Sequence, residues 1–169
     1  MKIKDINRDI NELRNLILYS KNHDLIDPNA FKKLERPFLE EDSAYVLWLK
    51  ENKPSLEERF LLLLGLAPHL HAGFYSEIST DLYFLPGLPP FQHYKLPTAL
   101  SFVELMKAYS LLPEVEIIQI IQRSFLVSKG IIKIGASARG MHWLLAPMHM
   151  PEQWVQHFLY DLNTFSATI

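Results

Sequence analysis

The stretch SLEERFLLLLGLAPHL, residues 55–70, decides the fold of this 169-residue chain. Ser55 and Glu58 have the spacing of a capping box, in which each side chain accepts a backbone N–H of the other residue. After one polar turn the sequence is apolar on every side of a helix, which is typical of a buried helix, and it is too short to cross a bilayer. The pattern therefore predicts a central helix that is bent or broken at Pro68.

Composition places the chain among globular proteins with a substantial core. Hydrophobic residues make up 49% and aromatic residues 12% of the sequence, which excludes wholesale disorder. The formal charge of −2 argues against a protein built to neutralise phosphate groups. The absence of cysteine excludes a disulfide scaffold, a cysteine nucleophile and cysteine–zinc sites. The N-terminus has no signal-peptide pattern and no run of 18 apolar residues occurs, so we expect a cytoplasmic protein without a membrane partner.

Residues 1–80 are expected to form a helical lobe around the central helix. Apolar residues recur at helical spacing in the first 20 residues, an Asp27-Pro28 pair marks a helix start, and Asp42 or Ser43 marks another. The expected helices cover, in order, residues 5–20, 27–34, 42–52, 55–70 and 73–78.

Residues 81–96 are expected to form a connecting loop between two lobes. The segment TDLYFLPGLPPFQHYKL, residues 80–96, contains prolines at 86, 89 and 90, which should prevent regular structure. It is too apolar for a flexible linker, so it either covers the core or fills a pocket on a partner protein. The candidate partner-binding residues are Phe84, Leu85, Leu88, Phe91 and Tyr94.

Residues 97–169 have the outline of a winged-helix-like module. Helices are expected at 97–109, at 113–124 and from Pro151 onward. Two strand-like pieces, 130–134 and 142–146, flank a small-residue segment that is typical of a hairpin tip. The predicted fold is therefore mainly α, with a helical bundle lobe packed on a winged-helix-like module that carries a small β-hairpin.

The hairpin tip, GASARGMH at residues 135–142, has two glycines spaced as in a phosphate-binding loop. Met141 and His142 stand where such a loop needs a lysine and a hydroxyl residue, so nothing would grip a terminal phosphate or hold magnesium. The segment also does not lie between a long buried strand and a helix. We therefore interpret it as a hairpin tip.

Histidines and paired carboxylates do not form a catalytic pattern. His69 and His71 lie at a helix end without a nearby carboxylate or cysteine, which favours a capping role over metal binding. The acidic residues at 40–42 and 57–58 lie at expected helix starts, where negative charge complements the helix dipole. We therefore expect no cofactor, no metal and no enzymatic activity. A histidine-centred site stays open as an alternative, with candidates His142, His149 and His157.

DNA binding is common among winged-helix modules, so the charge of this one is informative. Residues 97–169 carry five basic and five acidic residues, which gives zero net charge. The expected recognition helix, 113–124, has two glutamates, two glutamines and one arginine, a poor surface for phosphate. A small basic wing remains conceivable, formed by Lys129, Lys133 and Arg139. Nucleic-acid binding is therefore the second hypothesis.

Four segments follow one another along the chain: EERFLLLLGLAPHL, KLPTALSFVELMKAYS, SFLVSKGIIKI and LAPMHMPEQWVQHFL. Together they resemble the N-terminal, non-catalytic region of bacterial AAA+ ATPases that accompany phage-tail-like contractile injection systems. Residues 63–69, 96–99 and 148–159 match the pattern of that group in order.

The resemblance implies a helical region and a winged-helix-like module of the kind that precedes a motor domain. The loop at 83–94 departs from the group, because it is rich in proline and aromatic residues where the group has glycine. No phosphate-binding lysine, acidic magnesium motif or arginine finger is present, so no ATPase residue can be carried over. We expect a non-enzymatic adaptor whose partner is an AAA+ motor or a component of the injection apparatus.

Overall fold

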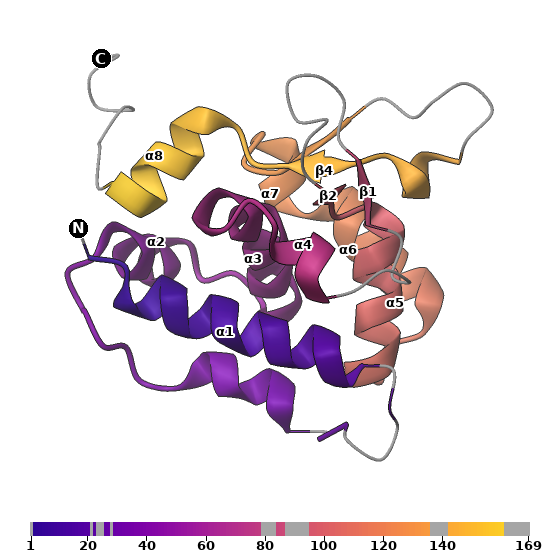
Figure 1. Cartoon of the computed structure of the whole chain (residues 1–169), viewed down its shortest axis with the longest axis horizontal. Helices are drawn as coiled ribbons and strands as arrows, with labels where there is room; N and C mark the ends of the chain where they lie inside the picture. Colours follow the sequence, from indigo (N-terminus) through magenta and orange to yellow (C-terminus); the bar gives the residue numbers. More distant parts are fainter. Residues whose placement is uncertain are drawn as a thin grey trace.

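The computed structural model describes residues 2–20, 22, 26–27, 29–78, 84–86, 95–135 and 142–160. Over these residues the chain is mainly helical, as the sequence predicts, and has two small two-stranded sheets (Figure 1). The elements of the first part are α1 (Lys4–Tyr19), the 3-10 helix η2 (Ala30–Glu35), α2 (Ala44–Asn52), α3 (Leu56–Leu70) and α4 (Phe74–Ile78).

Helix α3 is the central helix that the sequence predicts. It lies in the middle of the molecule and contacts α1, η2 and α4, and every residue from 59 to 68 is buried (Figure 1). The capping box is present: Ser55 Oγ accepts the N–H of Glu58 at 3.1 Å, and Glu58 Oε1 accepts the N–H of Ser55 at 3.2 Å. The buried apolar surface on all sides explains why other elements surround it.

Of the two outcomes predicted at Pro68, a bend or a break, the break does not occur, because α3 continues through this residue to Leu70. A proline inside a helix has no N–H for the carbonyl four residues earlier, which here belongs to Leu64. The hydroxyl of Tyr75 in α4 donates a hydrogen bond to that carbonyl. The packing of α4 against α3 therefore supplies the donor that Pro68 lacks.

The second part of the chain adds helices and one antiparallel strand pair. Its elements are α5 (Ala99–Tyr109), α6 (Glu114–Arg123), α7 (Phe125–Ser128), β3 (Lys133–Ile134), the 3-10 helix η3 (Trp143–Leu145), β4 (Met148–His149) and α8 (Glu152–Tyr160). Strands β3 and β4 pair in the register Lys133 with His149 and Ile134 with Met148.

The second strand of this pair lies later in the chain than predicted. Residues 142–146, predicted as a strand, contain η3, because Nδ1 of His142 accepts the N–H of Leu144 and thereby caps a helical turn. Gly135 donates its N–H to the carbonyl of Pro147 at 2.7 Å, just before the strand that forms the pair. The predicted tip beyond Gly135, residues 136–140, lies outside the described residues.

The segment predicted to lack regular structure contains the other strand pair. Strands β1 (Leu85–Pro86) and β2 (Lys95–Leu96) are antiparallel, with Leu85 opposite Leu96 and Pro86 opposite Lys95. A proline is tolerated here because each strand of a two-stranded sheet has an edge whose N–H groups need no ladder partner.

The two predicted lobes share one core. A single cluster of buried apolar residues contains members from both halves of the chain. Helix α8 contacts α2, where the rings of Trp48 and Phe158 meet edge to face with centroids 5.4 Å apart. The hydroxyl of Ser124 donates to Glu58 of α3 at 2.8 Å. Among the described residues no helix has the length and apolar character needed to span a bilayer.

Candidate protein-binding surface

Of the five loop residues predicted to bind a partner, two belong to the described part. The side chain of Phe84 is buried and stacks on Tyr75 with ring centroids 4.4 Å apart. At residue 84 the ring therefore covers the core, which is one of the two roles expected for this segment. The backbone of Leu85 lies in β1. The remaining candidates lie outside the described residues: Leu88, Phe91 and Tyr94.

A groove of about 660 Å³ lies between η2, the start of α3 and the turn from α5 to α6. Its volume falls within the range of about 300–1,000 Å³ that is common for binding pockets. Apolar and aromatic side chains make up the larger part of its wall. The lining residues are Asn29, Phe31, Lys32, Leu56, Glu57, Tyr109, Ser110, Leu111 and Leu112.

The edge of the groove is formed by Leu111, whose side chain is fully exposed. Helix α5 ends at Tyr109 and α6 begins after Pro113, so the intervening residues must turn sharply. Ser110 stabilises this turn, because its hydroxyl accepts the N–H of Leu112 at 3.1 Å. Leu112 turns toward the core while Leu111 points into solvent. Exposed leucines are individually common, but this one stands beside an apolar hollow.

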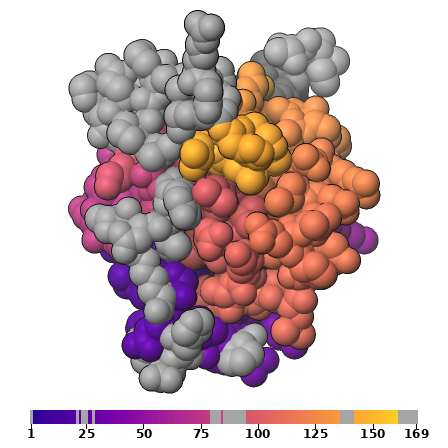
Figure 2. Space-filling model, turned by 90° about the vertical axis from the view of Figure 1, so that its right-hand side faces the viewer, coloured from indigo at the N-terminus to yellow at the C-terminus, as the bar shows by residue number. Residues whose placement is uncertain are grey.

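Tyr109 ties the groove to the rest of the fold. Its hydroxyl donates to the carbonyl of Leu16 in α1, and burial raises its pKa to about 12. The same side chain lines a smaller cavity of about 120 Å³, which Tyr19 and Ala30 also border. Figure 2 shows the salmon residues of α5 meeting the indigo residues of α1 on this side of the molecule. The wall at Tyr109 is thus held in place by two helices.

The rim of the groove carries two charges of opposite sign. Lys32 comes from η2, and Glu57 comes from the first turn of α3. Neither side chain forms an ion pair with another residue in the described part of the chain. Glu57 is favourable at the positive end of the α3 dipole, and its charge remains available to a partner. The base of the groove is therefore apolar, and its rim carries one positive and one negative charge.

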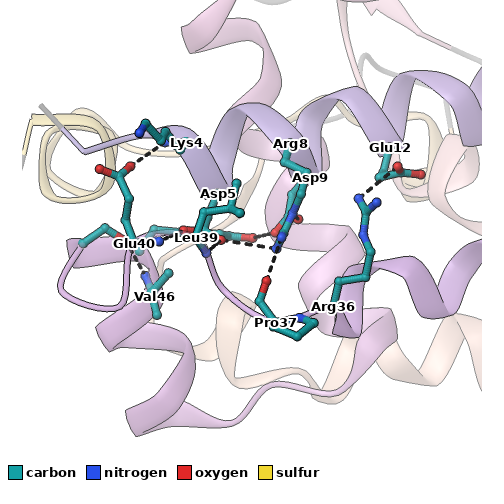
Figure 3. A network of polar contacts seen from close by, with 12 residues as sticks. Lys4, Asp5, Arg8, Asp9, Glu12, Arg36, Pro37, Leu39, Glu40 and Val46 are labelled. Carbon is teal, nitrogen blue, oxygen red and sulfur yellow. Dashed lines mark hydrogen bonds and ion pairs between the residues drawn. The ribbon is translucent and has the colours of Figure 1, made fainter.

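A second group of polar residues joins α1 to the segment before α2 (Figure 3). Asp5 accepts the N–H groups of Leu39 and Glu40, each at 2.8 Å. Glu40 in turn accepts the N–H of Lys4 at 2.9 Å and so caps the start of α1. The sequence predicted that Glu40 complements the helix that follows it, whereas its observed helix partner is α1.

Asp9 is the buried centre of this group. It accepts the hydroxyl of Tyr45 at 2.7 Å and Nη2 of Arg59 at 2.6 Å, and the Arg59 guanidinium lies over the ring of Phe38 at 5.6 Å. Burial, and next the charge of Asp9, raise the pKa of Tyr45 well above its usual value, so the phenol stays protonated and donates. Because all three groups are buried and engaged with one another, they hold α1, α2 and α3 together.

The histidines singled out by the sequence do not line the groove. His71 follows the last residue of α3, and its Nε2 lies 2.9 Å from Glu77 Oε2. Burial lowers the pKa of His69 and of His149. Among the residues that the structure describes, no three histidine or carboxylate side chains are grouped so as to hold a metal ion.

The two carboxylates that follow Glu40 have structural partners. Glu41 pairs with Lys50 and Asp42 pairs with Lys2, both on the surface. The hydrogen bond from Lys2 lowers the pKa of Asp42. These contacts fasten the segment before α2.

Comparison with models of protein families, with curated proteins and with solved structures finds no significant match to this chain.

Proposed function

We propose that this chain is a non-enzymatic protein-interaction domain whose partner docks in the groove beside Leu111. The observation that carries the proposal is a fully exposed leucine at the edge of a groove with an apolar wall. A few side chains that become fully desolvated in such pockets supply most of the binding energy of protein interfaces. The fixed position of Tyr109 supports the proposal further, because a rigid wall lowers the entropic cost of docking.

The class of partner follows from the sequence resemblance. The proposed role is that of an adaptor of the kind that precedes an AAA+ motor, with a motor or a component of a contractile injection apparatus as the partner. In this proposal residues 97–169 form a winged-helix-like scaffold, and the protein acts in the cytoplasm. The order of three helices (α5, α6 and α7), a strand pair and a last helix in that region supports the winged-helix part of the proposal.

Photo-crosslinking tests the docking surface. A photoreactive amino acid at residue 111 should crosslink to the partner, and the affinity of the purified partner should fall at least about tenfold for Leu111→Asp. Leu39→Asp is the matched control, since Leu39 is also an exposed leucine but does not line the groove. Equal affinity for the chain and for Leu111→Asp, with both variants folded, would reject the groove as the docking surface.

We keep the prediction that the loop residues outside the described part form a second contact with the partner. The double variant Phe91→Ala and Tyr94→Ala should weaken binding of the same partner if the loop takes part. Unchanged affinity of a folded double variant would confine docking to the groove.

Nucleic-acid binding is the second candidate function. It is favoured by three exposed cations, Arg123, Lys129 and Lys133, on α6 and the residues that follow it. It is opposed by Glu114 and Glu116, which lie exposed in the first turn of that helix. A mobility-shift assay with random duplex DNA at low salt separates the two candidates, because tight and salt-sensitive binding would contradict the adaptor role.

A further inference from the structure

We infer that the partner in the groove is a second copy of this chain, with Leu111 of each copy seated in the groove of the other. The inference rests on the docking surface of the proposed function alone, and it names a second copy as the occupant of that surface in place of a motor or an apparatus component. Its basis is that the projecting side chain, the hollow and the rim charges all belong to one face of one chain.

The first step is that the projecting side chain of Leu111 lies directly beside the groove that can receive it. Leu111 is fully exposed, yet it borders the groove that Phe31, Leu56 and Tyr109 line. When two such faces meet about a twofold axis, each projecting leucine lies over the hollow of the other copy. Twofold contacts of this kind use one self-complementary patch twice, and they are by far the commonest in soluble oligomers.

The second step is the sign of the rim charges. A rim with only one sign of charge would repel its own copy, whereas Lys32 and Glu57 have opposite signs and no ion-pair partner within the described residues. In the proposed twofold pairing Lys32 of one copy faces Glu57 of the other, and the reverse pair follows by symmetry. Two complementary ion pairs therefore surround the leucine contacts and fix the orientation of the copies.

The test measures self-association of the whole chain by sedimentation velocity from about 1 to about 100 μM. The unmodified chain should shift from monomer to dimer in this range, and Leu111→Asp should stay monomeric with an unchanged circular dichroism spectrum. Leu39→Asp should dimerise as the unmodified chain does. A monomeric unmodified chain throughout the range, or a Leu111→Asp variant that dimerises normally, overturns the inference.

Charge reversal tests the twofold geometry itself. Lys32→Glu and Glu57→Lys should each weaken dimerisation at least about tenfold, because each homodimer then contains two like-charged pairs. An equal mixture of the two variants should recover dimerisation, since the mixed dimer contains two opposite-charged pairs again. The double variant K32E/E57K should recover it for the same reason. Failure of both recoveries, with each variant folded, contradicts the proposed pairing.

These outcomes are distinguishable from failure of the proposed function. If the unmodified chain is monomeric but a different protein crosslinks to residue 111 and loses affinity on Leu111→Asp, the groove is a docking site and its occupant is not a second copy. If neither self-association nor another partner depends on Leu111, both proposals fail together.

Discussion

Tyr75 compensates for a proline inside the central helix. Pro68 has no N–H to donate to the carbonyl of Leu64, and the hydroxyl of Tyr75 donates to that carbonyl instead. The side chain of Tyr75 is buried, which raises its pKa well above the usual value and keeps the hydroxyl protonated. Its ring also stacks on Phe84, so one residue joins α3, α4 and the start of β1.

Replacing Tyr75 by phenylalanine should destabilise the fold by about 1–3 kcal/mol, the usual cost of a buried polar group left without a partner. The ring and its stacking on Phe84 remain, so the lost hydroxyl accounts for the change. The free energy of unfolding in urea measures the effect. In a Pro68→Ala background the backbone N–H of residue 68 can reach Leu64, and the cost of Tyr75→Phe should shrink. An equal cost in both backgrounds would contradict this role of the hydroxyl.

The carboxylate of Asp9 is expected to be among the most costly polar groups to remove. Asp9→Asn leaves the buried Arg59 cation without its charge partner, which typically costs about 3–5 kcal/mol. The position of Arg59 over Phe38 places the expected value near 3 kcal/mol, because the aromatic ring still attracts the cation. Urea unfolding measures the loss. Glu41→Gln, which breaks an exposed pair with Lys50, is the control and should change stability little.

At the scale of elements, Gly65 permits the close contact between α3 and the residues before β3. A Cβ at residue 65 would overlap Cδ1 of Ile132 and would also approach Cβ of Met150 at 3.8 Å. Both Ile132 and Met150 are fully buried, so neither can move away into solvent. The absence of a side chain at this position therefore sets the spacing between the helix and its neighbours.

Gly65→Ala should cost about 1–3 kcal/mol through overpacking, and Ile132→Val should cost about 0.5–1.5 kcal/mol through the lost methyl group. The double variant should lose less than the sum, because valine lacks the Cδ1 atom that the new Cβ meets. A double-mutant cycle in urea measures the difference. Gly73→Ala is the control, since its Cβ would meet only the end of the Glu77 side chain. Strict additivity of the first two changes would contradict the close contact.

Local sequence signals predicted most of the helices and the strand at Lys133–Ile134, but not the continuation of α3 through Pro68 or the position of the partner strand. The capping box at Ser55 and the helix starts near Ser43 and Thr98 depend on residues three apart in the chain, and all three are present in the structure. The continuation through Pro68 depends on a hydroxyl from another helix, which no local pattern contains. The shift of the last strand to β4 likewise depends on pairing with β3 across the intervening segment.

The candidate site was harder to predict than the fold. The groove joins residues from η2, α3 and the end of α5, which only the tertiary packing brings together. One sequence signal indicates the site, namely the pair Leu111 and Leu112 directly before Pro113. Because the helix ends here, one of the two leucines must face outward. The buried pair of Asp9 and Arg59 joins residues that are 50 positions apart in the chain. The only sign of it in the local sequence is an aspartate within the apolar face of α1.

At the scale of the whole molecule, two half-buried histidines, His69 and His149, lie where α3 meets the second half of the chain. Burial lowers the pKa of His69 from its usual 6.5; the charge of Glu152 raises it and that of His149 lowers it again. Burial also lowers the pKa of His149, as does the charge of Lys133, its partner in the β3–β4 register. Both imidazoles are therefore favoured in the neutral form where α3, the strand pair and α8 approach one another.

The direction of the resulting pH dependence follows from proton binding. In the unfolded chain both histidines take up protons near pH 6.5, whereas in the folded chain they do so only at lower pH. Between the folded pKa values and pH 6.5 the unfolded state thus binds more protons than the folded state. The contribution of the two histidines to stability is complete above pH 6.5 and is lost as the pH falls through the folded pKa values. The free energy of unfolding should therefore be lower at about pH 5 than at about pH 7.5.

The double variant His69→Gln and His149→Gln should reduce this loss, because glutamine takes up no proton in either state. Urea unfolding of both proteins at about pH 5 and about pH 7.5 measures the difference between the two losses. Carboxylates other than Glu152, whose charge acts on His69, contribute equally to both proteins, so their titration cancels in the comparison. An undiminished loss in the double variant would show that protonation of His69 and His149 does not lower the free energy of unfolding.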